Sequence, residues 1–236
     1  RIKYFYAKQH TNLHNARNQA LKKCKGIYIA FLDTDDIWHP SKLSKQISEL
    51  KKSKKKIIYS NCLILNKQTF IKKKKLSNKK LPSGFIFLNL IDNYLIFLCT
   101  LVFEKKILIE NNLRFDETFK IIGDFDLVMK LALKYEIICV QENLATYRIH
   151  KKSFSINNKL LEVYEQIKWY KHFIKVNKIN KIQKKKFSKF KSKIYLKKKV
   201  LLAKNLKEKI LIFLEILINF DIYNLKILFK SFFSKK

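Results

Sequence analysis

The stretch Ile27–Pro40, which reads IYIAFLDTDDIWHP, decides the fold. Its first part, Ile27–Leu32, is apolar or aromatic without a break and rich in residues that favour β-strands. An unbroken apolar run of this length predicts a strand buried on both faces of a parallel sheet. The carboxylates Asp33, Asp35 and Asp36 follow at its carboxyl end, which is the edge where open α/β sheets bind ligands.

These three carboxylates repel one another unless a cation lies among them. Carboxylate oxygens are ligands that Mg²⁺ and Mn²⁺ prefer, and such ions often carry a diphosphate. The alternative is a polar turn without a ligand, since aspartate is frequent in turns. The residues of this stretch alone leave a metal site and a plain turn equally open.

The composition is that of a globular chain. Of its 236 residues, 47% are hydrophobic, which is enough for the core of one large domain. The chain has only 3 glycines and contains neither GxGxxG nor a Walker A sequence, so the common glycine-rich phosphate loops are excluded. The four cysteines are far apart and show no CxxC spacing, which is typical of reduced thiols in a cytoplasmic protein.

The net charge of +34 is extreme, with 52 basic and 18 acidic residues. Most of the basic residues are lysines spread along the chain among Ile and Asn, a pattern that favours compositional bias on a solvated surface. The alternative is a surface that attracts nucleic acid or anionic lipid. No sequence motif of a specific nucleic-acid-binding fold supports the nucleic-acid alternative.

Strands and helices alternate along residues 1–155, which predicts a mainly parallel α/β sheet flanked by helices. The expected strands are Ile2–Tyr6, Ile27–Leu32, Ile57–Leu65, Leu95–Phe103, Ile137–Val140 and Ala145–Ile149. Helices are expected after a cap at Thr11 or Asn12, from Pro40, at Ile86–Ile91, at Glu104–Asn111 and from Asp124. Asn112 is expected to be a left-handed cap at the end of the fourth of these helices. Lys72–Lys80 is expected to be a surface loop.

Residues 156–236 differ in composition from the predicted sheet domain. They show no strand pattern and are rich in lysine, which predicts a helical C-terminal extension. Between residues 210 and 229 most side chains are Ile, Leu or Phe, but three charged residues in that segment disfavour a transmembrane span. We expect this segment either to lie on a membrane surface or to pack on the domain.

Three motifs occur along the chain in a definite order. The helix motif Asn15–Ala20 (NARNQA) precedes Ile27–Pro40, the turn Phe115–Glu117 (FDE) precedes Gly123–Leu127 (GDFDL), and Thr146–His150 (TYRIH) comes last. As an ordered set, these motifs resemble the family 2 glycosyltransferases, which have the GT-A fold and mostly invert the anomeric centre. The resemblance extends over the whole predicted sheet domain.

The resemblance implies that Asp33, Thr34 and Asp35 form the DxD motif of that family. Asp33 and Asp35 are then the expected ligands of Mn²⁺ or Mg²⁺, and His150 is expected to approach the metal or the diphosphate. Asp33, Thr34 and Asp36 are expected to contact a nucleotide-diphosphate sugar. A divalent ion offsets the negative charge that grows on the leaving oxygens. For His150, the alternative is a structural role in a strand.

The resemblance also assigns residues outside the DxD motif. Arg17 and Asn18 match an Ala-Arg-Asn sequence of the family and are expected to shape the donor pocket, with an exposed helix face as the alternative. Trp38 and the Ile86–Thr100 region are expected to line the acceptor side.

An inverting transfer needs a base that takes the proton from the acceptor hydroxyl as it attacks the anomeric carbon. Asp124 matches the aspartate of the family's Glu-Asp pair and is the expected base. Gly123 stands in the place of the glutamate, so support from that neighbour is missing. Asp126 is the second choice for the base, and its alternative role is a charge favourable to the helix start.

We therefore expect transfer of a sugar from a nucleotide-diphosphate sugar to a hydroxyl acceptor, in cell-surface polysaccharide or lipid-linked glycan synthesis. A glycan or lipid-linked acceptor, a cytoplasmic location and peripheral contact with the inner membrane face fit this expectation. The family's first two strands, which hold the nucleotide base, have no counterpart here, so the chain resembles an N-terminally truncated member. The alternatives are an inactive fragment or pseudo-enzyme, a basic nucleic-acid binder and a membrane-associated structural protein.

Overall fold

The structure is a computed structural model that describes residues 2–7, 9–66 and 73–218. The helices are α1 (Leu13–Lys23), α2 (Lys42–Ser53), α3 (Phe87–Asp92), α4 (Lys106–Glu110), α5 (Gly123–Lys134), α6 (Phe154–Asn157), α7 (Lys159–Val176), α8 (Lys181–Leu202) and α9 (Leu206–Ile218), with a 3-10 turn η1 (Leu98–Thr100). The strands are β1 (Tyr28–Ala30), β2 (Ile37–Trp38), β3 (Ile57–Asn66), β4 (Lys73–Lys75), β5 (Val102–Glu104) and β6 (Ile137–Ile149).

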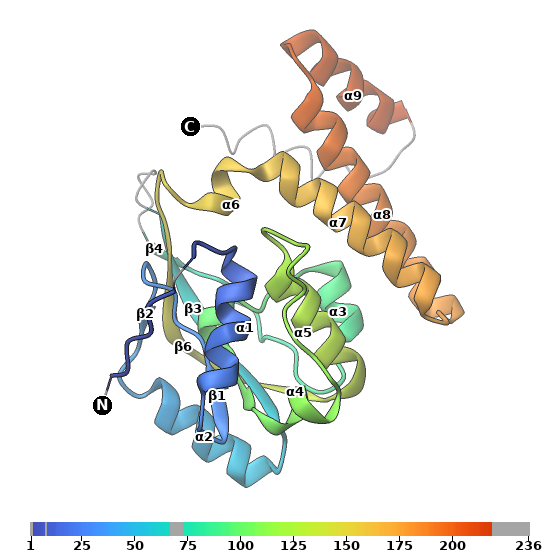
Figure 1. Cartoon of the computed structure of the whole chain (residues 1–236). Helices are drawn as coiled ribbons and strands as arrows, with labels where there is room; N and C mark the ends of the chain where they lie inside the picture. The colour runs from blue at the N-terminus through green and yellow to red at the C-terminus, as the bar shows by residue number, and fades with distance from the viewer. Residues whose placement is uncertain (1, 8, 67–72, 219–236) are drawn as a thin grey trace.

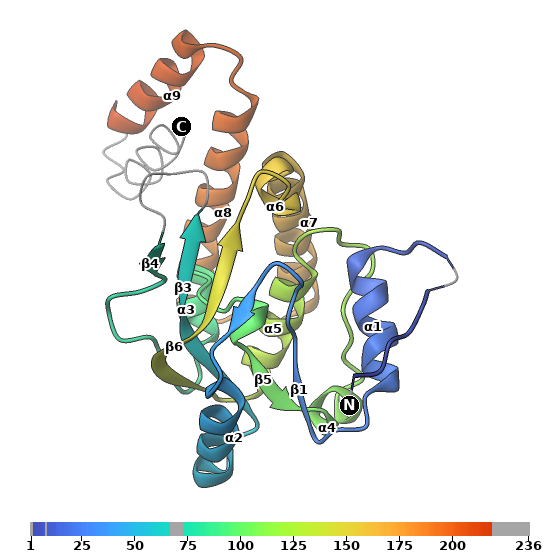
Figure 2. The same ribbon diagram turned by 90° about the vertical axis from the view of Figure 1, so that its left-hand side faces the viewer.

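One mixed sheet forms the centre of the molecule, with the strand order β1-β5-β3-β6-β2 and β4 paired to β3 (Figure 2). The β3–β6 pair is parallel and is the longest ladder, while the other four pairs are antiparallel. The predicted α/β sheet flanked by helices is confirmed, but the prediction that it is mainly parallel is wrong. Alternating strands and helices do not fix strand direction, because β5 lies between β1 and β3 and runs opposite to both.

The two faces of the sheet are buried against different helices. Ile57 and Tyr59 of β3 belong to the largest core cluster, which includes residues of α3, α5, α7 and α8. Ile58 points to the other face and packs with Leu50 of α2. Since successive strand residues face opposite sides, β3 is buried on both faces, as is β5 with Val102 and Phe103. Figure 1 shows α2 at the bottom of the view and α7 and α8 above the sheet domain and to its right.

Several predicted strands differ in the structure. The run Ile27–Leu32 forms only the three residues of β1, and Ile27 is 73% exposed, because β5 offers a ladder of only three residues. Residues 2–7 form no strand, since none of the described strands pairs with them. Part of the expected loop Lys72–Lys80 pairs with β3 as β4. The two strands predicted within 137–149 are one strand, β6, with register shifts opposite Asn61.

Helices α7 and α8 share their core with the sheet domain. The shared residues are Val163, Ile167, Trp169, Phe173, Phe187, Phe190 and Ile194. Aromatic rings join the elements: Phe87 of α3 lies 5.6 Å from Phe173, and Phe125 of α5 lies 4.8 Å from Trp169, both between ring centroids. Truncating such a buried ring to alanine typically costs about 3–5 kcal/mol. The predicted division at residue 155 stays a prediction, but no gap in the core separates α7 and α8 from the sheet.

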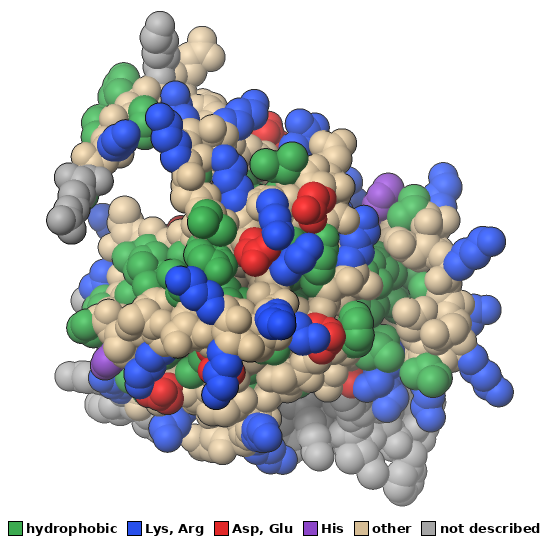
Figure 3. Space-filling view, turned by 90° about the horizontal axis from the view of Figure 1, so that it is seen from below, with side chains coloured by type: hydrophobic (Ala, Val, Ile, Leu, Met, Phe, Trp, Pro, Cys, Tyr) green, Lys and Arg blue, Asp and Glu red, His purple; other side chains and the backbone are tan. Residues whose placement is uncertain are grey.

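The rest of the C-terminal extension is also helical as far as residue 218. The predicted apolar segment at residues 210–229 lies only partly within the described residues, because it continues beyond 218. Within the described part of the chain, no helix is both long and apolar enough to cross a membrane. Figure 3 shows Lys and Arg side chains spread over the face of the molecule in view, with no single patch that would mark a polyanion site.

Candidate functional site

A cavity of about 770 Å³ lies between the carboxylate turn, α1, the start of α5, and α7 and α8. It brings together most of the site residues expected from the sequence. These are Arg17, Asp33, Thr34, Asp35, Asp36 and Asp124. Part of the Ile86–Thr100 region, which was expected on the acceptor side, lines it too, namely residues 90, 91, 93, 94 and 97–99.

The carboxylates of the turn are met by protein donors from other elements. The guanidinium of Arg17 donates to both carboxylate oxygens of Asp33 at 2.9 Å. Asp35 pairs with the imidazole of His150 at 3.0 Å, and Asp36 accepts the backbone N–H of Arg148 at 3.0 Å. The turn is thereby tied to α1 on one side and to the end of β6 on the other.

Two features of the turn decide which carboxylates can take a ligand. Asp36 is buried, and this burial raises its pKa to about 6, against the hydrogen bond from Arg148 that lowers it. The side chains of Asp33 and Asp35 are 43% and 41% exposed and line the cavity. The carbonyls of Thr34 and Asp35 accept the guanidinium of Arg148 from behind the turn.

The carboxylate turn could hold a divalent cation only if a bound ligand and water supplied part of the coordination. Among the described residues no group of three or more His, Cys, Asp or Glu is arranged to hold a metal ion by itself. Two half-exposed carboxylates facing a cavity suit a cation that takes its remaining ligands from a bound diphosphate and water, as Mg²⁺ commonly does. Asp33 and Asp35 would hold such an ion, which would offset charge on the diphosphate.

His150 lies beside the turn, as the resemblance implied. Its Nδ1 accepts the backbone N–H of Lys152 at 3.2 Å, so the neutral ring carries its proton on Nε2. That Nε2–H then donates to Asp35. In this arrangement His150 orients the Asp35 carboxylate, and its contact with a metal or diphosphate stays a prediction.

Arg17 and Asn18 are neighbours on α1 but have different contacts. Arg17 lines the cavity and its guanidinium also lies 5.5 Å from the ring centroid of Phe115. Asn18 exchanges two hydrogen bonds with the backbone of Phe115 and donates to Glu117. Asn18 therefore fixes the turn at Phe115–Glu117 and does not line the cavity.

Asp124 lies near the start of α5 and lines the cavity. Burial raises its pKa above the ordinary range for aspartate, while Arg17 and the N–H of Phe125 lower it. A carboxylate with a raised pKa in a cavity is suited to accept a proton. The hydroxyl of Tyr94, which also lines the cavity, is buried and has no hydrogen-bond partner among the described residues.

Asp126 and Trp38, two other residues singled out in the sequence, do not line the cavity. Asp126 is buried and accepts the indole N–H of Trp169 at 3.2 Å and the ammonium of Lys130 at 2.6 Å. Trp38 donates its indole N–H to the carbonyl of Cys99 at 2.9 Å, and the ammonium of Lys42 lies over its ring. Both side chains are thus engaged in contacts within the fold.

Comparisons with known proteins agree with the motifs. Residues 1–108 match the family model described as Glycosyl transferase family 2. The UDP-Glc:alpha-D-GlcNAc-diphosphoundecaprenol beta-1,3-glucosyltransferase WfgD of Escherichia coli is 47% identical over 58 residues, which are 25% of this chain and 23% of that protein. An uncharacterized glycosyltransferase of Rickettsia typhi is 30% identical over 156 residues, 64% of this chain and 48% of that protein. The chain thus spans about half the length of these relatives or less.

The fold of this chain is similar to that of solved protein structures. Residues 1–349 of S. aureus TarS give a TM-score of 0.53 at 15% identity, covering 84% of this chain and 56% of that one. The same TarS fragment in complex with UDP-GlcNAc gives 0.56 at 13% identity, covering 86% and 60%. At such identity the likeness shows the fold alone, which is the GT-A fold expected from the sequence.

One prediction concerns His14 of α1, which is fully buried and accepts the backbone N–H of Gly123 at 3.2 Å. Burial first, and Arg17 second, lower its pKa to about 4, while Glu165, Asp116 and Asp33 raise it. Between pH 4 and 6.5 the unfolded chain binds a proton that the folded chain does not, so this group makes the free energy of unfolding rise with pH. The slope it adds is at most about 1.4 kcal/mol per pH unit.

Urea unfolding of His14→Gln from pH 4 to 7 should therefore show a shallower rise than the parent chain. The raised pKa of Asp36 acts in the opposite direction in both chains and cancels in the comparison. The exposed His172 provides the matched control, since His172→Gln should keep the parent slope. Equal slopes in the parent chain and His14→Gln would contradict the buried neutral histidine.

Proposed function

We propose that the chain is a member of glycosyl transferase family 2, whose model matches residues 1–108, and that it transfers a sugar from a nucleotide-diphosphate sugar to a hydroxyl acceptor. One observation carries the proposal: a single cavity is lined both by the carboxylate turn Asp33–Asp36 and by Asp124. The carboxylate turn is suited to hold the diphosphate of a donor through a cation. Asp124 is suited to act as the base for the hydroxyl of an acceptor. The two groups come from parts of the chain about 90 residues apart.

The donor is proposed to be a UDP-sugar. The printed name of WfgD includes UDP-Glc, and TarS, which shares the fold, has a structure with UDP-GlcNAc. The diphosphate would lie at Asp33 and Asp35 with Mn²⁺ or Mg²⁺, which supplies positive charge for the leaving oxygens. Thr34 and Asp36 lie in the same turn, and Arg17 holds Asp33 in place.

The transfer itself is proposed to be inverting. Asp124 takes the proton of the acceptor hydroxyl while the hydroxyl oxygen bonds to the anomeric carbon, and the bond from that carbon to the nucleoside diphosphate breaks. Burial raises the pKa of Asp124 above its ordinary value, and a more basic carboxylate is a better proton acceptor. The acceptor is proposed to be a glycan or lipid-linked sugar, because WfgD is named for a diphosphoundecaprenol acceptor.

We expect Asp124→Asn to lower the turnover of UDP-glucose with a lipid-linked acceptor by about 10²- to 10⁴-fold, because the base is lost. Donor binding should stay unchanged, since the carboxylate turn is intact. Asp126→Asn is the matched variant on the same helix and should keep turnover within about 10-fold, because Asp126 does not line the cavity. Full activity of Asp124→Asn would contradict the assignment. If the parent chain bound UDP but transferred no sugar to any acceptor, the inactive alternative would be favoured.

Peripheral membrane contact is a further part of the proposal. Helix α8 carries ten lysines and no acidic residue, and large apolar side chains are exposed at its C-terminal end and on α9. These exposed residues are Leu201, Leu202, Ile210, Leu211 and Leu214. Lysines beside exposed leucines suit an anionic bilayer surface, where the apolar side chains leave water. Such a location would bring the enzyme to a lipid-linked acceptor on the cytoplasmic side.

The chain is expected to float with phosphatidylglycerol-containing vesicles in a density gradient and to do so less with phosphatidylcholine alone. Leu211→Glu should weaken flotation, because it places a charge among the exposed leucines. Leu43→Glu on α2, also at an exposed leucine, serves as the control and should float as the parent does. A chain that stays at the bottom of the gradient with both vesicle types would contradict membrane contact.

A further inference from the structure

Four successive backbone N–H groups just before Asp124 all donate to side chains of other elements. The N–H groups of residues 120, 121 and 122 reach the carboxylate of Glu165 on α7 at 2.7, 2.9 and 3.1 Å. The N–H of Gly123 reaches Nε2 of His14 on α1 at 3.2 Å. Helix α5 begins at Gly123, so these four groups form the entry to the helix that carries Asp124.

The entry to α5 depends on these two acceptors. The first N–H groups of a helix have no partner within it and are usually met by a capping side chain. The residue in the cap position here is Ile122, whose side chain makes no such bond. A buried N–H without a partner costs about 1–3 kcal/mol, so this entry is stable only with acceptors from elsewhere. Glu165 and His14 supply them.

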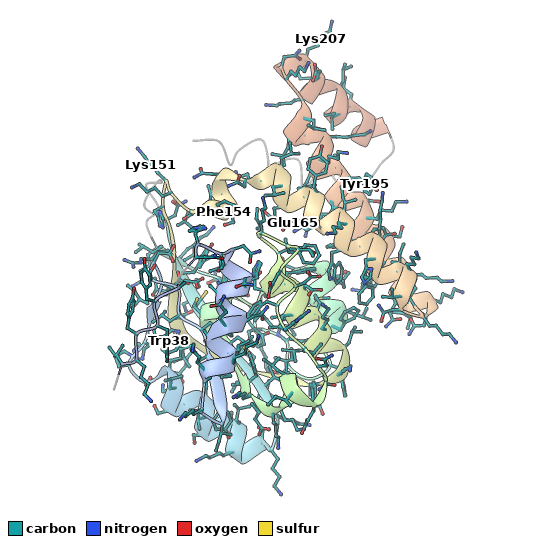
Figure 4. The ribbon with its side chains drawn as sticks, viewed as in Figure 1. Trp38, Lys151, Phe154, Glu165, Tyr195 and Lys207 are labelled. Carbon is teal, nitrogen blue, oxygen red and sulfur yellow. The ribbon has the colours of Figure 1, made fainter. Side chains whose placement is uncertain are left out.

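Glu165 is unusual for its place on α7. It is only 6% exposed and stands among the buried positions Val163, Ile167 and Trp169. An ionised carboxylate is costly in such surroundings unless it accepts several hydrogen bonds. Its three backbone donors account for this position. Figure 4 shows Glu165 on α7 at the place where the helix passes the loop that leads into α5.

His14 fits Gly123 by shape as well as by its hydrogen bond. A Cβ atom at residue 123 would lie 2.6 Å from Nε2 and Cε1 of the imidazole, closer than real contacts allow. The ring therefore fills the space that any side chain at residue 123 would need. It is held there by stacking on Phe115, with ring centroids 5.7 Å apart. His14 itself does not line the cavity, so it acts on the site through the backbone.

We propose that Glu165 and His14 are positioning residues that hold residues 120–123 so that the Asp124 carboxylate faces the acceptor. This inference rests on the proposed function, in which Asp124 is the base. It makes α7, which lies outside the predicted sheet domain, part of the catalytic arrangement. Neither residue transfers a proton in this account.

A double-mutant cycle separates positioning from general support of the fold. Glu165→Gln keeps the size of the side chain but replaces one of its two acceptor oxygens by an NH₂ donor, so at least one of the three backbone N–H groups loses its acceptor. We expect kcat to fall about 10- to 100-fold with little change in KM for the donor, because misplacement of the base affects the chemical step. In the Asp124→Asn background the same change should have no further effect. An equal loss in both backgrounds, or no loss in either, would overturn the proposal.

Two variants of His14 test whether its hydrogen bond to the N–H of Gly123 matters for the rate. His14→Gln carries an acceptor near the position of Nε2 and should keep most of the parent rate, whereas His14→Leu should lose about 10- to 100-fold. Equal rates for these two variants would count against His14. The exposed residues Glu110 and His172 provide controls, since Glu110→Gln and His172→Gln should match the parent.

Amide hydrogen exchange tests the hold on the loop without any activity. In Glu165→Gln at least one of the N–H groups of residues 120–122 should exchange about 10-fold faster or more, while those of residues 127–134 keep their rates. Unchanged exchange at 120–122 would overturn the proposal. If no chain turned over substrate although Glu165→Gln released these amides, the proposed function would fail and the hold of Glu165 on the loop would stand.

Discussion

The site depends on holding three carboxylates, which repel one another, within a turn of four residues. Asp33, Asp35 and Asp36 share one turn because Arg17, His150 and the backbone of Arg148 each meet one of them. The carboxylates of the first two are more than one-third exposed, so each pair contributes only about 0–1 kcal/mol to stability. Their effect is to orient: the turn is fixed between α1 and the end of β6, with two carboxylates directed into the cavity.

The opposite wall of the cavity is also held by residues distant in the sequence. There the groups that are held are backbone N–H donors, where in the turn they are carboxylates. There the entry to α5 takes its acceptors from α1 and α7, over sequence separations of 43 to 109 residues. Helix α1 thus contributes to both walls, through Arg17 at the turn and His14 at α5. The C-terminal helices close the cavity and share the core of the sheet, which joins the two parts of the chain that differ so much in composition.

Local features of the fold were predictable from the sequence, and features that depend on distant partners were not. The cap at Asn12 and the left-handed Asn112 were expected and are present, since turn and cap chemistry is local. Strand direction and the short length of β1 depend on β5, about 70 residues away. In the site, the motifs placed Asp33–Asp36 and Asp124, whereas no motif marks Glu165, because its three backbone donors lie 43 to 45 residues away in the sequence.

The central claim is that the turn Asp33–Asp36 forms a diphosphate site, and calorimetric titration of UDP with and without Mn²⁺ tests it most directly. The account predicts binding that strengthens with Mn²⁺ and weakens at least about 10-fold in Asp35→Asn, because a charged ligand to the ion is lost. Asp92→Asn, on α3 and outside the turn, should bind as the parent does. A folded chain that binds no UDP with Mn²⁺, or binds it equally well after Asp35→Asn, would contradict the account.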